Sequence, residues 1–117
     1  MRIDEVIHQP VRLRVMASLV ALDQKEQLDF TRLRDLLSVT DDNLGAHLLK
    51  LEEAGYIRVE KTFVGRKPRT FLSATAKGRA AFEEHVDALE GIIRSSDRRG
   101  ATEPAARQPS GKKRIMR

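Results

Sequence analysis

The chain contains no cysteine and no tryptophan, and only 4% of its 117 residues are aromatic. The absence of cysteine excludes a disulfide framework, a thiolate metal site and a cysteine nucleophile, and it favours a reducing compartment. Because aromatic residues are few, a core has to consist of Leu, Val, Ile and Ala, which favours packed helices over a large sheet. The length is enough for one compact domain and too short for two.

A long hydrophobic run is also missing. The first residues, from Met1 to Glu5, reach a charged residue every two or three positions and do not resemble a signal peptide. No stretch approaches the length of a membrane-spanning helix. We therefore expect a cytoplasmic protein.

An excess of positive charge is missing outside the C-terminal end. Residues 1–93 carry 14 Lys and Arg against 15 Asp and Glu, whereas residues 94–117 carry 8 against 2, so the net charge of +5 comes from the tail. Residues 94–117 also lack hydrophobic periodicity, which predicts a disordered basic tail after a folded domain of residues 1–93. The tail either adds sequence-independent attraction to phosphates or only solubilises the chain.

Signatures of enzymes and metal sites are absent. There is no Gly-rich phosphate loop, no GxSxG elbow and no HExxH pattern, and the three histidines are scattered at positions 8, 47 and 85. His85 has acidic neighbours at helical spacing, which is typical of a solvent-exposed polar face. We predict no catalytic residue, no metal site, no cofactor and no enzymatic activity.

Hydrophobic residues recur with a helical period in four long segments, and a short lead-in helix is expected before Pro10. The helix at residues 41–54 has Thr40 as its N-cap and Gly55 after its end, and Asp29 or Thr31 caps the helix before it. The predicted helices cover residues 10–22, about 31–37, 41–54 and about 76–94.

After Gly55 the period changes from 3.6 to 2, so residues 56–73 are predicted to form a β-hairpin with its turn at residues 65–68. Residues 28–30 are a brief extended piece. The order of helix, short strand, helix, tight turn, helix, basic hairpin and helix is typical of a winged helix-turn-helix. The predicted fold class is therefore mainly α with a small β-hairpin wing (α+β).

Three segments carry a resemblance to a known family. Residues 42–57 (DNLGAHLLKLEEAGYI) resemble the recognition helix and following strand of MarR-like and ArsR-like transcriptional regulators. Residues 10–16 (PVRLRVM) resemble the first helix of these proteins, and residues 74–79 (ATAKGR) the entry to the last one. The likeness covers roughly residues 5–93. It implies a repressor that binds double-stranded DNA sequence-specifically as a homodimer and associates with the nucleoid.

The outward face of the predicted recognition helix follows from its buried stripe of Leu44, Leu48 and Leu51. Asn43 can pair with adenine and Lys50 can reach a phosphate or guanine. A merely solvated helix face is the alternative, and His47 either donates to a phosphate or covers the edge of the core. Asp41 and Asp42 are explained more simply by the helix dipole than by base contacts. The candidate DNA-binding residues here are Thr40, Asp42, Asn43, Ala46, His47 and Lys50.

The hairpin is the most basic predicted element, and its tip can lie along the DNA backbone or enter a minor groove. Ordinary charge that protects a sheet edge is the alternative explanation. The candidate DNA-binding residues of the wing are Lys61, Arg66, Lys67 and Arg69.

The last helix carries a longer apolar stripe than a small core needs, and a second subunit would cover it. Alternatively, the helix folds back onto its own domain. A small-molecule effector between the first and last helices is left open. The candidate dimer residues are Ile3, Val6, Ile7, Phe82, Val86, Leu89, Ile92 and Ile93.

Two other functions remain open from the sequence, because a fold does not determine a function. One is a nonspecific, chromatin-like protein that coats DNA. The other is a winged-helix module that binds another protein.

Overall fold

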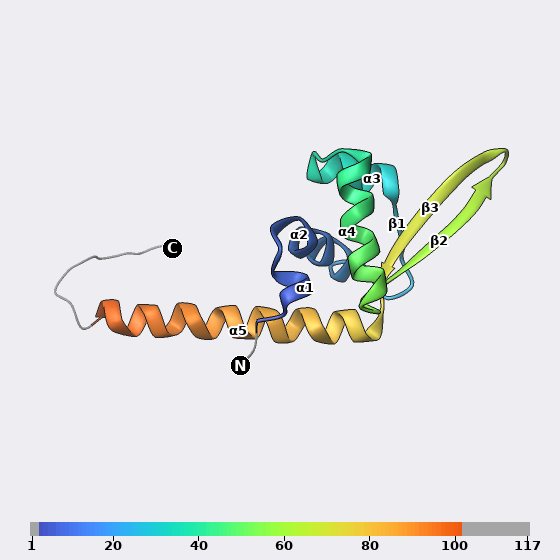
Figure 1. The fold of residues 1–117 in the computed structure, drawn as a ribbon. Coiled ribbons are helices and arrows are strands. Elements are labelled where there is room, and N and C mark those ends of the chain that lie inside the picture. The colour runs from blue at the N-terminus through green and yellow to red at the C-terminus, as the bar shows by residue number, and fades with distance from the viewer. Residues whose placement is uncertain (1–2, 102–117) are drawn as a thin grey trace.

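A computed structural model describes residues 3–101, with side chains described for residues 3–96. Within this part a mostly helical body carries a small antiparallel sheet whose hairpin projects from it as a wing (Figure 1), which confirms the predicted fold class. The elements are α1 (Glu5–His8), α2 (Pro10–Val20), β1 (Leu28–Asp29), α3 (Phe30–Leu37), α4 (Asp41–Glu53), β2 (Ile57–Val64), β3 (Lys67–Ala74) and α5 (Ala76–Ala101).

Short-range capping fixes where the helices begin. The α3 helix starts after Asp29, whose carboxylate accepts hydrogen bonds from the amides of Thr31 and Arg32. Of the two predicted caps, Asp29 is therefore the one used. Ser38 ends α3 with a left-handed φ of 56°, and the Thr40 hydroxyl accepts the Asn43 amide at 3.1 Å at the start of α4. The turn of the helix-turn-helix is thus closed from both sides.

The sheet has the strand order β1-β3-β2, so the predicted extended piece at β1 pairs with β3. In the hairpin, Val64 pairs with Lys67 and Phe63 with Pro68, and this leaves a turn of only Gly65 and Arg66. The predicted turn over residues 65–68 is therefore wrong in its second half. Gly65 has φ 64°, which lets the two long strands join through a tight connection.

The core lies between α2, α3, α4 and the base of the sheet, with α1 and α5 closing it. It is built almost entirely from aliphatic side chains, as the scarcity of aromatic residues requires. Its completely buried members include Ile7, Val15, Met16, Leu19, Leu33, Leu44, Leu51 and Leu72.

The α5 helix is anchored at its first turn. The Thr75 hydroxyl accepts the Gly78 amide at 3.0 Å and donates to the Gly55 carbonyl at 2.7 Å. Arg79 donates to the carbonyls of Val20 and Leu22 at the end of α2, both at 3.1 Å. The start of α5 is therefore tied to both α2 and the end of α4.

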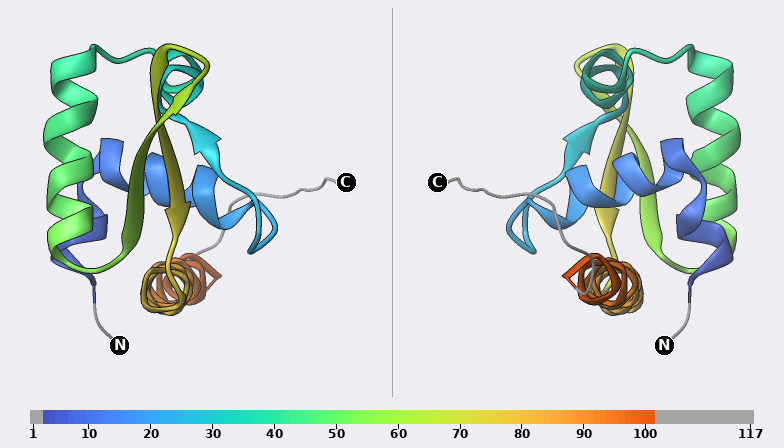
Figure 2. Two further views of the ribbon diagram at one scale, coloured as in Figure 1. Left: turned by 90° about the vertical axis from the view of Figure 1, so that its right-hand side faces the viewer. Right: turned by 90° about the vertical axis from the view of Figure 1, so that its left-hand side faces the viewer.

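From this anchor α5 runs to Ala101, beyond the predicted helix end near Arg94. The first part of the segment predicted to be a disordered tail is therefore helical, and residues 102–117 of that segment lie outside the described residues. Figure 2 shows α5 end-on, crossing below the rest of the domain. Within the part of the chain that the structure describes, no helix is long and apolar enough to cross a membrane.

Candidate nucleic-acid interface

The recognition helix α4 turns one stripe inward and leaves the opposite face open. Leu44, Leu48 and Leu51 are buried, as their spacing predicts. The predicted DNA-binding residues on the opposite face are exposed, apart from His47, which is half-buried; they are Thr40, Asp42, Asn43, Ala46, His47 and Lys50. The helix therefore presents the predicted set as one surface.

Asp41 is neutralised from the neighbouring helix. The guanidinium of Arg34 on α3 lies 2.9 Å from one carboxylate oxygen of Asp41, and a second nitrogen lies 2.9 Å from Asp35. Hydrogen bonds to Asp41 and then Asp35 raise the pKa of Arg34 above its ordinary value. Sequence reasoning missed Arg34, although a basic residue on the helix that precedes an acidic helix start is a signal that could have been used.

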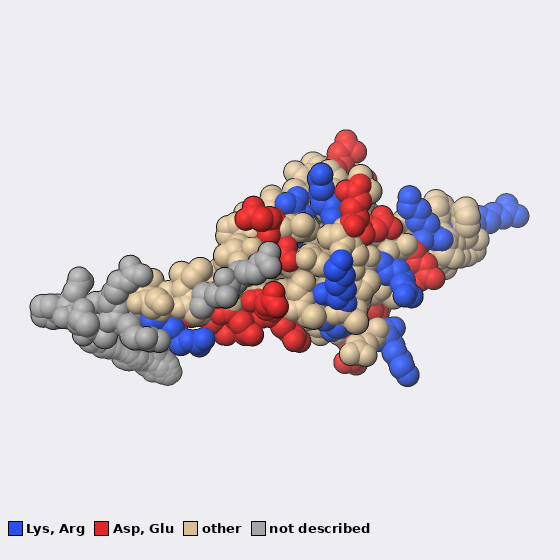
Figure 3. Space-filling model, turned by 60° about the horizontal axis from the view of Figure 1, so that its bottom comes forward, with Lys and Arg blue, Asp and Glu red and all other residues tan. Residues whose placement is uncertain are grey.

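The wing presents its basic side chains to solvent, and Figure 3 shows Lys and Arg over the wing while acidic side chains gather along the middle of α5. Arg69 differs from the other basic residues of the wing, because its guanidinium forms an ion pair with the carboxylate of Asp29. Arg69 is thus partly engaged within the sheet. The other predicted wing residues are Lys61, Arg66 and Lys67, all exposed.

Two apolar side chains at the wing tip are exposed and were not predicted as functional. Phe63 is 70% exposed and Val64 is 54% exposed. Alternation along β2 places Phe63 on the same hairpin face as Val59 and Lys61, which line a hollow of about 410 Å³ against α4. The tip therefore combines an aromatic side chain facing the recognition-helix side with the cation of Arg66.

His47 is held from behind by α2. The Arg12 guanidinium lies 3.3 Å from His47 Nδ1, and its Nε also donates to the carbonyl of Val6. Burial, and then the charge of Arg12, lower the pKa of His47 below its ordinary value. The neutral imidazole is therefore favoured near neutral pH.

The predicted dimer residues do not form one continuous exposed surface. Ile7 is completely buried in the domain's own core, so its assignment to an interface is wrong for this conformation. Most of the others are half-buried, namely Ile3, Val6, Phe82, Val86 and Leu89. Ile92 and Ile93 remain 48% and 57% exposed on the outer part of α5.

His85 is buried, which overturns the prediction of an exposed polar position. Its Nδ1 accepts the Asp4 amide at 3.2 Å, and its ring meets that of His8 edge to face at 5.8 Å. Burial, followed by the charge of His8, lowers the pKa of His85. The helical pattern misled here because the short N-terminal segment covers a face that the helix alone would expose.

Asp4 also ties that segment to the end of α4. Its second carboxylate oxygen accepts the Tyr56 hydroxyl at 2.6 Å. Burial raises the pKa of Asp4, but the hydrogen bonds from Tyr56 and from the amides of Ile7 and Val6 outweigh it, so the pKa is lowered. The same bond to Asp4, together with burial, raises the pKa of Tyr56 to about 12.

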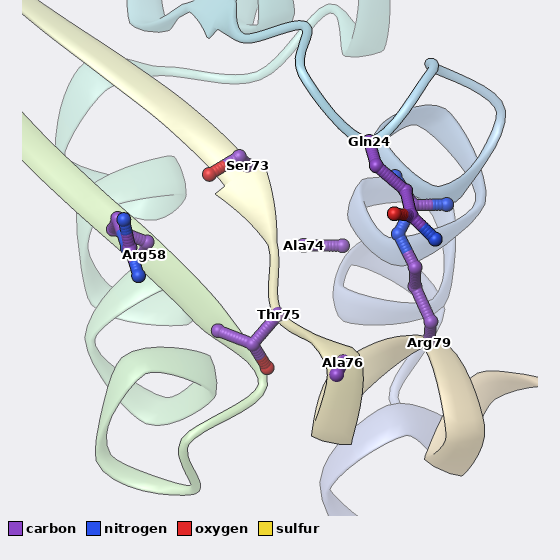
Figure 4. A pocket seen from close by; sticks show the side chains of 7 residues that line it. All are labelled: Gln24, Arg58, Ser73, Ala74, Thr75, Ala76 and Arg79. Carbon is purple, nitrogen blue, oxygen red and sulfur yellow. The ribbon is translucent and has the colours of Figure 1, made fainter.

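A second hollow, of about 290 Å³, lies between the base of the hairpin and the start of α5 (Figure 4). Its Arg79 is already committed to the carbonyls of Val20 and Leu22, while Arg58 stands on β2 at its rim. Among the described residues no group of three His, Asp or Glu side chains could hold a metal ion. Neither hollow gathers a recognisable catalytic set.

Comparisons with known proteins agree with this architecture. A family model described as a winged helix DNA-binding domain matches residues 11–93. An uncharacterised protein of Methanocaldococcus jannaschii is 34% identical over 82 residues, covering 70% of this chain and 86% of that protein.

Solved structures add two similar chains. A transcriptional regulator homologue from Pyrococcus horikoshii is 26% identical with a TM-score of 0.73, covering 80% of this chain and 90% of that one. A structure described as a MarR-family transcriptional regulator from Enterococcus faecalis is 21% identical with a TM-score of 0.61, covering 84% of each chain. The second likeness concerns the fold alone.

Proposed function

Because the chain belongs to the family of winged helix DNA-binding domains, we propose that it represses transcription by binding a specific double-stranded DNA sequence as a homodimer. The family consists of DNA-binding domains and not of enzymes, in agreement with the lack of a catalytic motif. The observation that carries the proposal is the exposed polar face of α4 beside a projecting basic wing.

In this proposal α4 enters the major groove. Asn43 is fully on the open face and has the paired donor and acceptor that match adenine, while Lys50, two turns further along, reaches a phosphate or a guanine. Ala46 between them is small enough to let the helix approach closely. Thr40 and the free amides at the helix start hold a phosphate.

The wing reaches the flanking backbone or minor groove. Arg66 at the two-residue turn is the residue that we expect to contribute most there, since nothing else in the hairpin extends as far. The Arg34–Asp41 pair supports the arrangement, because it reduces the repulsion between the acidic start of α4 and the phosphates. Asp42 keeps its helix-dipole role.

A homodimer is supported by the outer part of α5. Ile92 and Ile93 are exposed there, and the helix continues to Ala101 beyond the body of the domain. A second copy packed on this part would cover both side chains and present two recognition helices to half-sites about one helical turn apart. Sedimentation tests this: the chain is expected to be a dimer, and an Ile93→Glu variant a monomer.

Selection of bound sequences from a random duplex pool tests the function directly. A regulator enriches a roughly palindromic motif, and Asn43→Ala relaxes the base preference at one position in each half-site. Enrichment of no sequence, together with salt-sensitive binding, would instead identify a protein that coats DNA. A chain that binds no duplex at low salt is neither, and a protein-interaction role would then remain.

Matched variants separate the wing from general charge effects. Arg66→Ala is expected to weaken binding to all sequences and to reduce the salt slope by about one unit. Arg58→Ala removes the same charge from the base of the same hairpin, beside the start of α5, and is expected to leave both nearly unchanged. A chain that ends at Ala101 measures what residues 102–117 add.

A further inference from the structure

His47 lies at the border between the exposed and the buried face of α4. It follows Asn43 by one turn and precedes Lys50 by three residues, so the three side chains share one face of the helix. Unlike its two neighbours it is only half-exposed, because Arg12 reaches it from α2. The sequence left two roles open for His47, donation to a phosphate or covering the edge of the core, and this contact points to a different role.

The contact also fixes which ring nitrogen carries the proton. A guanidinium has five N–H donors and no acceptor, so the Arg12–His47 hydrogen bond requires a bare Nδ1 on His47. The neutral ring therefore carries its proton on Nε2. Nε2 of His47 has no hydrogen-bond partner among residues 3–96. It is not buried, because the only buried side-chain nitrogen or oxygen without a partner in this range is Nε2 of His85. Nε2 of His47 is therefore accessible to solvent.

We propose that Arg12 is a positioning residue that holds His47 as the neutral tautomer, with its Nε2–H directed at an acceptor of the DNA. The inference rests on the proposed function and adds to it the chemical class of the contact. A purine N7, a guanine O6 or a thymine O4 is the acceptor that such a donor meets in the major groove. His47 thereby reads an acceptor edge instead of attracting phosphates as a cation.

The surrounding charges favour the neutral ring. Arg12 of α2 faces the imidazole directly, and Lys50 adds a second cation on α4 itself. Glu5 and His8 are the ionisable residues of α1, which also contacts α4, and Arg34 of α3 is paired with Asp41 at the start of α4. Of all these groups, only Arg12 shifts the pKa of His47, in the same direction as its burial.

Arg12 is also anchored on its other side. Its Nε donates to the carbonyl of Val6 in α1, so the guanidinium bridges α1 and α4 and cannot turn freely away from the ring. Replacement of Arg12 by Gln removes both the charge and the forked donor. Arg14→Gln is the matched control, since Arg14 lies two residues further along α2 and donates to the Leu37 carbonyl without contacting His47.

Imidazole ¹⁵N NMR on the free, full-length chain tests the positioning step without DNA. The wild type and Arg14→Gln are expected to show the Nε2–H tautomer at His47 and a pKa below 6.5. In Arg12→Gln the pKa is expected to return toward that value and the tautomer preference to weaken. An Nδ1–H tautomer in the wild type, or an unchanged ring in Arg12→Gln, would overturn the positioning role.

Binding to the selected duplex tests the contact with DNA. His47→Gln keeps a donor near the Nε2 position, whereas His47→Asn keeps only a group near Nδ1, so the Asn variant is expected to lose about tenfold more affinity. Equal affinity of the Gln and Asn variants would refute the donor role. If no duplex binds, the proposed function fails, and the NMR result still decides whether Arg12 controls the ring.

A pH series provides a further readout. Wild-type affinity is expected to change less than that of Arg12→Gln as pH falls from about 7.5 to 6, because the lowered pKa of His47 favours the neutral ring. In Arg12→Gln only burial still lowers the pKa of His47, so a larger fraction of the ring becomes a cation over this range, and binding to unrelated DNA is expected to strengthen more as pH falls. A wild type with the same pH dependence as Arg12→Gln would contradict the proposal.

Discussion

Replacement of Gly78 by Ala tests the packing between α5 and the end of α4. In an ordinary helix this change stabilises a protein by up to about 1 kcal/mol, because Ala is the better helix former. Here a Cβ at residue 78 would lie 2.0 Å from the carbonyl oxygen of Tyr56 and 2.8 Å from its carbonyl carbon. Both neighbours are backbone atoms, so no side-chain rotation can relieve the overlap.

The expected magnitude follows from what has to move. The Thr75 amide donates to the Tyr56 carbonyl at 3.0 Å, and the Thr75 hydroxyl donates to the Gly55 carbonyl at 2.7 Å. A shift of the helix start by an ångström or so breaks or weakens both bonds, at about 1 kcal/mol each, and overpacking costs about 1–3 kcal/mol more. After the helix-propensity gain, we expect Gly78→Ala to lower the free energy of unfolding by roughly 2–4 kcal/mol.

Gly45→Ala is the matched control. Gly45 lies inside α4, has no positive φ, and has no neighbouring atom within 4 Å of the point where a Cβ would stand, so this variant is expected to gain up to about 1 kcal/mol. Urea unfolding followed by circular dichroism measures both, at one protein concentration because association would affect apparent stability. The reasoning is refuted if Gly78→Ala is as stable as the wild type while Gly45→Ala behaves as expected.

Three further predictions concern ionisation and the wing. Because the pKa of His85 is lowered from 6.5 in the folded state, the unfolded chain binds more protons below about pH 6.5, so the free energy of unfolding decreases as the pH is lowered through this range. His85→Asn is expected to flatten this dependence in urea unfolding, and an equally steep slope would contradict it. Tyr56 is the chain's single tyrosine, so phenolate absorbance is expected to report a pKa of about 12 that moves toward 10.0 in Asp4→Asn; titration in the ordinary range in the wild type would argue against the bond. Phe63→Ala is expected to leave stability within about 0.5 kcal/mol but to weaken DNA binding roughly fivefold, unlike Val64→Ala on the other hairpin face, and equal binding by the two variants would exclude a role for the aromatic ring.

The local parts of the fold could be predicted because they depend on residues close in sequence. Thr40 caps α4 by reaching an amide three residues away, and Gly55 follows that helix with φ 79°. The stripe of Leu44, Leu48 and Leu51 repeats at the period of one helix, so its burial follows once any core forms. The same reasoning placed Asn43 and Lys50 on the open face.

Predictions of element boundaries failed where turn propensity competed with strand pairing and where a helix lacks an apolar repeat. Pro68 and Lys67 were assigned to the turn because of their turn propensity, but they pair with Phe63 and Val64 in an extended hairpin. The strand continues because the projecting hairpin leaves Pro68 on a solvent-exposed edge, where a missing amide is tolerated. The helix past Arg94 was missed because its polar composition lacks the apolar repeat on which the prediction relied.

The sequence by itself determined the order of the elements, the inward face of each helix and the residues of the open face of α4, since periodicity and capping act within a few residues. Only the tertiary structure decided that His85 is buried by the segment around Asp4, 81 residues away, and that Arg12 holds His47 across 35 residues. Such contacts depend on how α1, α2 and α5 are placed against one another. The protonation of a side chain is therefore set by neighbours that no local pattern identifies.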